Sequence, residues 1–273
     1  MSILVSVDIE GIAGVVHPEQ TRRGNADYER ARHWMTAEAN AAIRGAFAGG
    51  AERVTVNDSH GDFRNLLPDE LDARAEVLLG KPRDLGMMAG VDADDCKAVF
   101  LVGWHARSGA AGILSHTISS FAFTRVSVDG IEIGEAGLYG AVAAEFAVPV
   151  ALYSGDDAFV EETAPLFPGA IGVVVKRAHG NRVATSLSQA MACDAIEAGA
   201  REAAGKLSSL NVQPLATPAS VRVEATTVAL ADLFATLPIV RRADPLTLEF
   251  RAPTMRYAVR VLNSLSAMSF MLR

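Results

Sequence analysis

Two carboxylate side chains follow directly after the first apolar stretch of the chain. Residues 2–7 (SILVSV) are apolar or small, and Asp8 and Glu10 come next. Residues two apart on an extended segment point to the same side. Two carboxylates in that arrangement repel each other unless a cation lies between them. Asp-x-Glu by itself is a weak pattern, but it indicates a place where a positive ion could be held.

Three of the six histidines occur at or just after other expected strands. His60 ends the motif VNDSH, His105 lies in GWHAR, and His116 follows in the glycine-containing segment GILSHTISS. Glu135 comes at the end of a predicted hairpin. In an open α/β sheet, ligands bind beyond the carboxyl ends of the strands, so these side chains are expected to meet the two N-terminal acids. The other histidines, interpreted as surface or core residues, are His17, His33 and His179.

The donor types in this group indicate a particular kind of metal site. Carboxylate and imidazole without thiolate suit Zn²⁺, or Mn²⁺ or Co²⁺, in a catalytic site with open positions. The two cysteines, Cys96 and Cys193, belong to no CxxC motif, which excludes a thiolate zinc site and a disulfide framework. Five carboxylate and imidazole donors exceed what one tetrahedral zinc needs. The pattern therefore predicts two metal ions bridged by a carboxylate, the arrangement with which hydrolases activate water.

Each of these residues also has an ordinary structural interpretation. His105, which follows Trp104, is equally consistent with a satisfied buried histidine. Asn57 and Asp58 are better explained as residues that shape a turn or cap a helix than as ligands. Residues 154–157 (SGDD) are typical of a loop leading into a helix N-cap, where acidic residues suit the helix dipole. The metal interpretation depends on several carboxylates and imidazoles at successive strand ends, not on any one of them.

The elements that must position these residues alternate between strand and helix along most of the chain. This predicts an α/β fold with a mainly parallel central sheet flanked by helices. Asp129-Gly130, between the expected strands 123–128 and 131–134, is the strongest hairpin signal. The other expected strands are 2–7, 52–58, 76–80, 97–103, 149–155, 171–176, 221–227 and 246–252; the expected helices are 26–48, 135–147, one beginning at 156–157, 188–206, 228–236 and one beginning near 253.

A change in composition near residue 211 suggests a domain boundary. Residues 211–220 (NVQPLATPAS) contain proline and serine without a hydrophobic period and are interpreted as a linker. We therefore expect 1–210 to form the α/β domain that carries the metal site, and 211–273 to form a small α+β C-terminal annex. A length of 273 residues is sufficient for one large domain with such an annex.

Charge and hydropathy restrict which kinds of partner and which cellular compartment are expected. The net charge of −7 argues against a nucleic-acid partner, which would call for a basic surface. The N-terminal apolar stretch is too short for a signal peptide and lacks a basic n-region. No run of about 20 apolar residues exists that would span a membrane. These features predict a cytoplasmic protein that binds neither nucleic acid nor membrane.

Several motifs in matching order resemble the zinc D-aminopeptidase family, the DppA-like metallopeptidases. The similarity extends from the N-terminus to about residue 190 and continues more weakly into the expected annex. Each motif alone is weak, but their occurrence in this order is highly specific. The motifs are SVDIEGIAG (6–14), DYERARHWMTAEAN (27–40), VNDSH (56–60), GWHAR (103–107), SHT (115–117), GE (134–135) and SGDD (154–157).

The resemblance implies a set of site residues. Members of this family bind two zinc ions through five residues and have a histidine in an S-H-[ST] motif that is proposed to be catalytic; His116 matches that motif. Thr117 and Trp104 stand where the family pattern leads us to expect Ser and Tyr, which affects pocket shape and leaves the metal set intact. The positions that match the metal ligands are Asp8, Glu10, His60, His105 and Glu135.

The resemblance also implies an activity and an assembly. Its best-known member is a ring of ten subunits with enclosed sites, and it removes N-terminal D-amino acids from short D-Ala-containing peptides. We therefore expect a zinc-dependent D-aminopeptidase with two Zn²⁺ per subunit, assembled as a homo-oligomeric ring of ten. It would remove the N-terminal residue, a D-amino acid such as D-Ala, from short peptides or amides, and a preference for L-residues is the alternative. His116 would donate a proton, stabilise an oxyanion or attack directly, and we favour the first two roles.

Two other functions fit the same donors. Dinuclear sites of Asp, Glu and His also hydrolyse phosphate esters, and Arg107 and Lys176 are the basic residues that such a site would use. The third hypothesis is a non-catalytic metal- or peptide-binding protein. The lack of an evident signal peptide argues against an exported receptor, and a histidine that is not a ligand favours catalysis.

Overall fold

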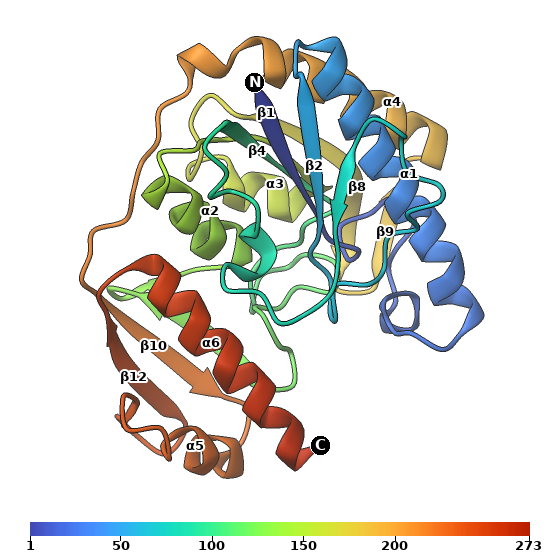
Figure 1. Ribbon diagram of the computed structural model, residues 1–273. Helices are drawn as coiled ribbons and strands as arrows, with labels where there is room; N and C mark the ends of the chain where they lie inside the picture. Colours follow the sequence, from blue (N-terminus) through green and yellow to red (C-terminus); the bar gives the residue numbers. More distant parts are fainter.

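A seven-stranded sheet forms the centre of the larger part of the molecule in the computed structural model, which describes all 273 residues (Figure 1). The strand order is β3-β2-β1-β4-β7-β8-β9, and every neighbouring pair is parallel except β8 and β9. The predicted mainly parallel α/β fold is thereby confirmed. The strands are β1 (Ser2–Val7), β2 (Arg53–Asp58), β3 (Glu76–Leu78), β4 (Cys96–Val102), β7 (Val150–Asp156), β8 (Ile171–Gly180) and β9 (Val183–Ser186).

The two faces of this sheet are covered by different helices because both faces of its central strands are apolar. Alternate residues of β1 and β4 belong to two separate hydrophobic cores. One core includes α1 (Ala26–Ala48) and α4 (Gln189–Gly205), which pack on each other, and the other includes α2 (Glu135–Glu145). Gly45 permits the close packing of α1 on α4, since a Cβ there would lie 2.4 Å from the backbone oxygen of Glu197.

A second, five-stranded antiparallel sheet lies beside the first, in the order β11-β12-β10-β5-β6 (Figure 1). Its central strand β10 pairs on one side with β12 and on the other with β5. The predicted hairpin is present, with positive φ at Asp129 and Gly130 in its turn. The strands are β5 (Phe123–Val128), β6 (Ile131–Glu132), β10 (Ala219–Ala225), β11 (Arg241–Arg242) and β12 (Thr247–Ala252).

The second sheet joins two distant parts of the chain. The β5–β6 hairpin belongs to the first 210 residues, whereas the other strands of this sheet come after residue 218. Residues 211–218 between them form neither helix nor strand. The division of the chain at residue 210 stays a prediction. The remaining helices are α3 (Asp157–Thr163), α5 (Val228–Phe234) and α6 (Met255–Ser269), with 3₁₀ turns at η1 (Pro18–Thr21), η2 (Gly86–Met88), η3 (Leu207–Ser209) and η4 (Phe270–Leu272).

The largest departure from the predicted elements is at the sheet edge. The strand expected at 171–176 continues to Gly180 and returns as β9, so the two form a hairpin that the sequence pattern did not indicate. β9 (VATS) is half exposed along its length, and such a strand has no regular apolar alternation to reveal it. None of the helices is long and apolar enough to cross a membrane.

Candidate metal centre

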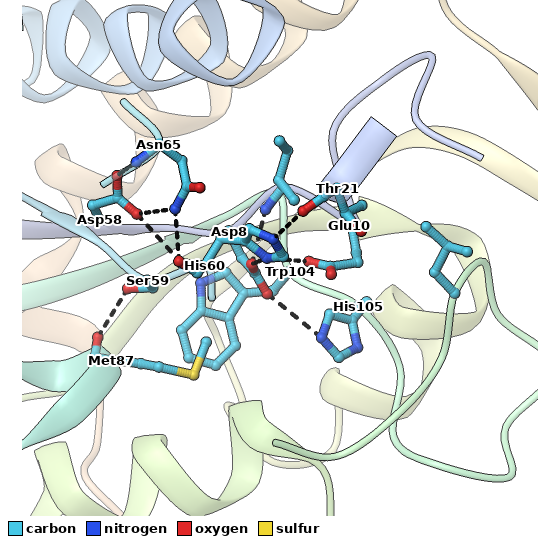
Figure 2. Close-up of polar contacts among 12 residues, drawn as sticks. Asp8, Glu10, Thr21, Asp58, Ser59, His60, Asn65, Met87, Trp104 and His105 are labelled. Atoms are coloured by element: carbon cyan, nitrogen blue, oxygen red, sulfur yellow. Dashed lines mark hydrogen bonds and ion pairs between the residues drawn. The ribbon is translucent and has the colours of Figure 1, made fainter. Parts of the chain in front are cut away.

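The sheet brings the expected site residues together at its carboxyl edge. Asp8 follows β1, His60 follows β2, and His105 follows β4. These strands are neighbours in the order β2-β1-β4 and run in the same direction, so the residues after them meet at one edge. Figure 2 shows Asp8, His60 and His105 close together. Glu10 lies in the turn after β1, and Glu135 is the first residue of α2. The topology therefore places residues from four parts of the chain at one point.

The distances show a single cluster of donor atoms. His60 Nδ1 lies 3.2 Å from Asp8 Oδ1 and 3.0 Å from Glu10 Oε2. His105 Nε2 lies 3.5 Å from Asp8 Oδ2 and 3.6 Å from Glu135 Oε1. The three acids and His105 are buried, and His60 is nearly so. Burying three carboxylates together is costly without positive charge among them.

Two glycines allow the turns that carry these residues to touch. Gly11 donates its N–H to the carbonyl oxygen of Gly103 at 2.7 Å. A Cβ on Gly11 would lie 2.0 Å from the carbonyl oxygen of Trp104, and a Cβ on Gly103 would lie 2.4 Å from that of Asp8. Gly103 also has φ +68, which disfavours other residues. The glycines in SVDIEG and GWHAR therefore set the separation between the two turns that carry the candidate ligands.

The three histidines are oriented in the same way. Each has one ring nitrogen within hydrogen-bond distance of a backbone carbonyl, which can only accept, so that nitrogen carries the hydrogen. The other nitrogen then presents a lone pair to the carboxylates. Such an arrangement is repulsive unless a proton or a metal ion lies between them. The bonds are His60 Nε2–H to Thr21 O at 2.8 Å, His105 Nδ1–H to Ala106 O at 3.0 Å and His116 Nδ1–H to Leu114 O at 2.9 Å.

The pKa values in the cluster reflect the same conflict. Burial, with the neighbouring Glu10 carboxylate, raises the pKa of Asp8 to about 7. Burial alone would lower the pKa of His105, but the carboxylates of Glu135 and Asp8 outweigh it and raise that pKa to about 9. The pKa of His60 is raised in the same way, mainly by Glu10. The metal-free cluster therefore retains extra protons, and a bound cation would displace them.

The donors fit a divalent metal. Glu10 Oε2 is buried and has no hydrogen-bond partner. Ligand atoms lie within 4.8 Å of one another in two groups that share His105, and neither group contains sulfur. Oxygen and imidazole donors in this number suit Zn²⁺ among the common metals. The groups are Asp8, Glu10 and His105, and His105, His116 and Glu135.

His116 differs from the strand-end residues in its origin and exposure. It lies in the segment between β4 and β5, its ring stacks on that of His105 with centroids 4.1 Å apart, and its Nε2 is 3.9 Å from Glu135 Oε1. Its side chain is 18% exposed, more than any other in the cluster. Burial and the neighbouring His105 lower the pKa of His116. A neutral, partly accessible imidazole thus borders the buried donors.

Lys176 holds one of the turns of the candidate metal centre, a role that the sequence did not reveal. Its ammonium is buried and donates to the carbonyl oxygens of Glu10 at 2.6 Å, Ile12 at 2.9 Å and Val15 at 2.6 Å. It therefore holds the turn that presents Glu10. The phosphoesterase hypothesis used Lys176 as a phosphate-binding residue, but all three of its donors are engaged. The other basic residue of that hypothesis, Arg107, is paired with Glu132 and Glu162.

Two further acids act on backbone groups beside the site. Asp58 Oδ2 accepts from the N–H groups of Asn65 at 2.5 Å and Leu66 at 2.7 Å, so it shapes the loop after β2 as a turn-forming residue would. Asp156 Oδ1 accepts from Phe159 N–H at 2.7 Å, which confirms the expected N-cap of α3. Neither acid belongs to the donor groups.

A parallel α/β sheet whose strand ends gather carboxylates and imidazoles defines a candidate metal-dependent hydrolase. Comparison with known proteins gives the family. The model of the D-aminopeptidase family, peptidase family M55, matches residues 1–264. The chain therefore belongs to this D-aminopeptidase family, as the motifs indicated.

A sequence match and a structural match, both from Bacillus subtilis, illustrate the similarity. A D-aminopeptidase of strain 168 is 34% identical over 192 residues, which cover 70% of this chain and 69% of the relative. The solved structure of the Zn-dependent D-aminopeptidase DppA, described as a self-compartmentalizing protease, superposes with a TM-score of 0.94 at 27% identity. That match covers 99% of this chain and 98% of the solved one, so the similarity includes the second sheet as well as the first.

Proposed function

We propose that the protein is a zinc-dependent aminopeptidase that removes the N-terminal residue, a D-amino acid such as D-Ala, from short peptides or amides. Membership in the D-aminopeptidase family supports the reaction, and the Zn-dependent solved relative supports the metal. The observation that carries the proposal is the buried cluster in which three carboxylates lie close together and His60 and His105 each lie 3.0–3.6 Å from two of them. A divalent cation resolves both features at once.

We assign five residues to two zinc ions per subunit, with Mn²⁺ or Co²⁺ as possible substitutes. Asp8 directs Oδ1 toward His60 and Oδ2 toward His105, so its carboxylate faces both parts of the cluster. Asp8 would therefore be placed to hold a metal ion together with either histidine. The proposed ligands are Asp8, Glu10, His60, His105 and Glu135. When bound, the zinc ions lower the pKa of water and polarise the scissile carbonyl.

His116 is proposed as the residue that moves a proton. Its Nδ1–H is bonded to the carbonyl of Leu114, so Nε2 is the nitrogen free to react. From this position Nε2 can take a proton from the attacking water and pass it to the leaving amine. From the same place it can stabilise the oxyanion, which is the alternative role. Direct attack by Nε2 is the third and least favoured role, because activated water already supplies a nucleophile.

We further propose that the chain assembles into a homo-oligomer, with a ring of ten subunits as the specific form. The support is the self-compartmentalizing character of the solved relative and the match over nearly the full length of both chains. Light scattering coupled to size-exclusion chromatography measures the mass directly. A particle of ten 28.8 kDa subunits is expected, and a monomer would contradict the assembly while leaving the proposed reaction untested.

One assay separates the proposed reaction from the other hypotheses. The purified protein, loaded with Zn²⁺, is offered the p-nitroanilides of D-Ala and L-Ala and p-nitrophenyl phosphate, with a chelated sample as control. Turnover of the D-Ala anilide that chelation abolishes is expected. Preference for the phosphate ester would support a phosphoesterase, and zinc binding without turnover of any substrate would support a binding protein.

A further inference from the structure

The segment that carries His116 contains two strained residues, one on each side of it. Leu114 has φ +50 and Ile118 has φ +62, in the left-handed region that residues other than glycine rarely adopt. Ile118 is β-branched, which makes this conformation more costly. Such residues persist only where the surrounding structure holds them. The position of His116 is therefore determined by contacts from outside its own segment.

Both strained residues are bound by groups from elsewhere in the fold. Ile118 donates its N–H to Glu135 Oε1 at 2.5 Å. Leu114 donates its N–H to the carbonyl oxygen of Asn181 at 2.9 Å. Asn181 lies in the turn between β8 and β9, the hairpin at the edge of the seven-stranded sheet. One anchor is thus a proposed zinc ligand, and the other is a hairpin turn with no part in the metal cluster.

The side chain of Asn181 extends this second anchor. Its Nδ2 donates to the carbonyl oxygen of Gly112 at 3.1 Å and lies 3.3 Å from Ser115 Oγ. Together with the bond to Leu114, Asn181 contacts three of the five residues that precede His116. The His116 ring is in turn tied to this segment, because its Nδ1–H is bonded to the carbonyl of Leu114.

We infer that Asn181 is a positioning residue, which holds the His116 imidazole in register with the metal centre through Gly112, Leu114 and Ser115. The inference rests on the proposed role of His116. Asn181 makes no hydrogen bond to a proposed zinc ligand, so its hydrogen bonds act on the 112–115 segment. Its replacement should loosen the segment and reduce turnover while leaving the metal in place. On this proposal, the hydrogen bonds from Asn181 restrain the segment before His116 in one conformation.

The test uses two variants of Asn181 and a matched control. Asn181→Ala removes the side-chain contacts, and Asn181→Asp keeps the shape but removes the Nδ2 donor. Arg182→Ala is the control, because Arg182 is the exposed neighbour in the same turn and makes no hydrogen bond or ion pair. The measurements are hydrogen exchange of peptides that cover residues 110–118, bound zinc, and kcat and KM for D-Ala p-nitroanilide.

For both Asn181 variants we expect faster exchange in 110–118, full zinc content and a kcat roughly five- to tenfold lower with KM nearly unchanged, since small misplacements of a reacting group are costly. Arg182→Ala should match the wild type in hydrogen exchange, zinc content, kcat and KM. Unchanged hydrogen exchange in 110–118 would show that the side chain of Asn181 does not restrain this segment. Faster exchange with unchanged kcat would overturn the positioning role. His116→Ala tests the proposed function separately, since the exchange result does not depend on whether His116 is catalytic.

Discussion

The proposed metal ligands and the proposed proton-transfer residue are positioned by different means. Asp8, His60 and His105 lie within three residues of the ends of three adjacent parallel strands, whose hydrogen bonds fix where each of these segments begins. His116 lies in a long connection, between two residues with left-handed backbone, and is held by individual hydrogen bonds from other elements. The ligands are thus placed by the fold as a whole, whereas His116 is placed by a few contacts that can be removed one at a time.

This difference suits the two chemical tasks. A metal site needs donors that stay buried and preorganised, and side chains at strand ends in a packed sheet meet this need. A group that exchanges protons with substrate must reach it, and a partly exposed residue on a connecting segment can do so. Substitutions in the two regions should therefore separate metal binding from turnover.

The largest effect is expected from the ligand cluster. Asp8→Ala should reduce the bound zinc and bring turnover of D-Ala p-nitroanilide to background, because the Asp8 carboxylate faces both His60 and His105. Treatment of the wild type with a chelator should have the same result, and added Zn²⁺ should restore only the wild type. Elemental analysis of the purified protein measures the metal. Two zinc ions per subunit in Asp8→Ala would refute its role as a ligand.

His116→Ala should affect turnover alone. We expect kcat to fall by about 10²–10⁴-fold, the usual contribution of a positioned acid or base, with bound zinc unchanged. His179→Ala is a suitable control, because His179 is exposed and contacts only Thr185 through its ring. Near-wild-type turnover in His116→Ala would remove the residue from the mechanism. Loss of zinc would instead indicate that His116 is a metal ligand, and the two regions would then not differ in function.

Lys176→Met should weaken metal binding without removing any ligand. The variant loses the three bonds to carbonyl oxygens that hold the Glu10 turn, and substitutions of residues that support ligands typically cost 10- to 100-fold in metal affinity. Competition with a chromogenic chelator measures the affinity. Lys97→Met is the matched control, because Lys97 is exposed on β4 and its ammonium reaches only Asp94 O. Equal affinity in the two variants would show that the turn does not depend on Lys176.

The smallest effect concerns Glu38, which holds the other side of the same turn. Its Oε1 accepts from Ala13 N–H at 2.8 Å, and burial raises its pKa to about 7. As pH rises from the usual carboxyl value of about 4.5, the unfolded chain ionises while the folded protein keeps the proton, so stability is lost up to about pH 7. The ammonium of Lys176 opposes this loss.

Glu38→Gln keeps an acceptor for Ala13 and has no carboxyl group to titrate. Its stability relative to the wild type should therefore increase between about pH 4.5 and pH 7 and stay constant above. Urea unfolding at a series of pH values measures the difference. A difference that does not change with pH would show that Glu38 has an ordinary pKa in the folded state.

Much of this arrangement could be predicted from the sequence, because it depends on local patterns. Short apolar runs revealed the buried strands, and the acids and histidines just after them identified the candidate ligands. A parallel sheet has one carboxyl edge, so residues that follow its strands must meet there. The motif SGDD was recognised as a helix N-cap from its composition alone, and Asp156 fills that role.

Other features could not be predicted, because they depend on contacts between distant residues. Lys176 on β8 reaches carbonyl groups more than 160 residues away, and nothing in its own neighbourhood marks it as a support for Glu10. The β5–β6 hairpin was evident, but its place in a sheet with β10 and β12 was not. Strand β9 escaped detection because an exposed edge strand carries little hydrophobic pattern.

The sequence by itself determined the α/β class, the candidate metal donors and the family, since strand periodicity, residue chemistry and motif order are local properties of the chain. Only the tertiary structure decided which nitrogen of each histidine faces the carboxylates, that Lys176 is engaged by carbonyl groups, and that Asn181 contacts the His116 segment. Hydrogen-bond partners across the fold depend on the relative placement of whole elements, which the packing of helices on both faces of the sheet establishes.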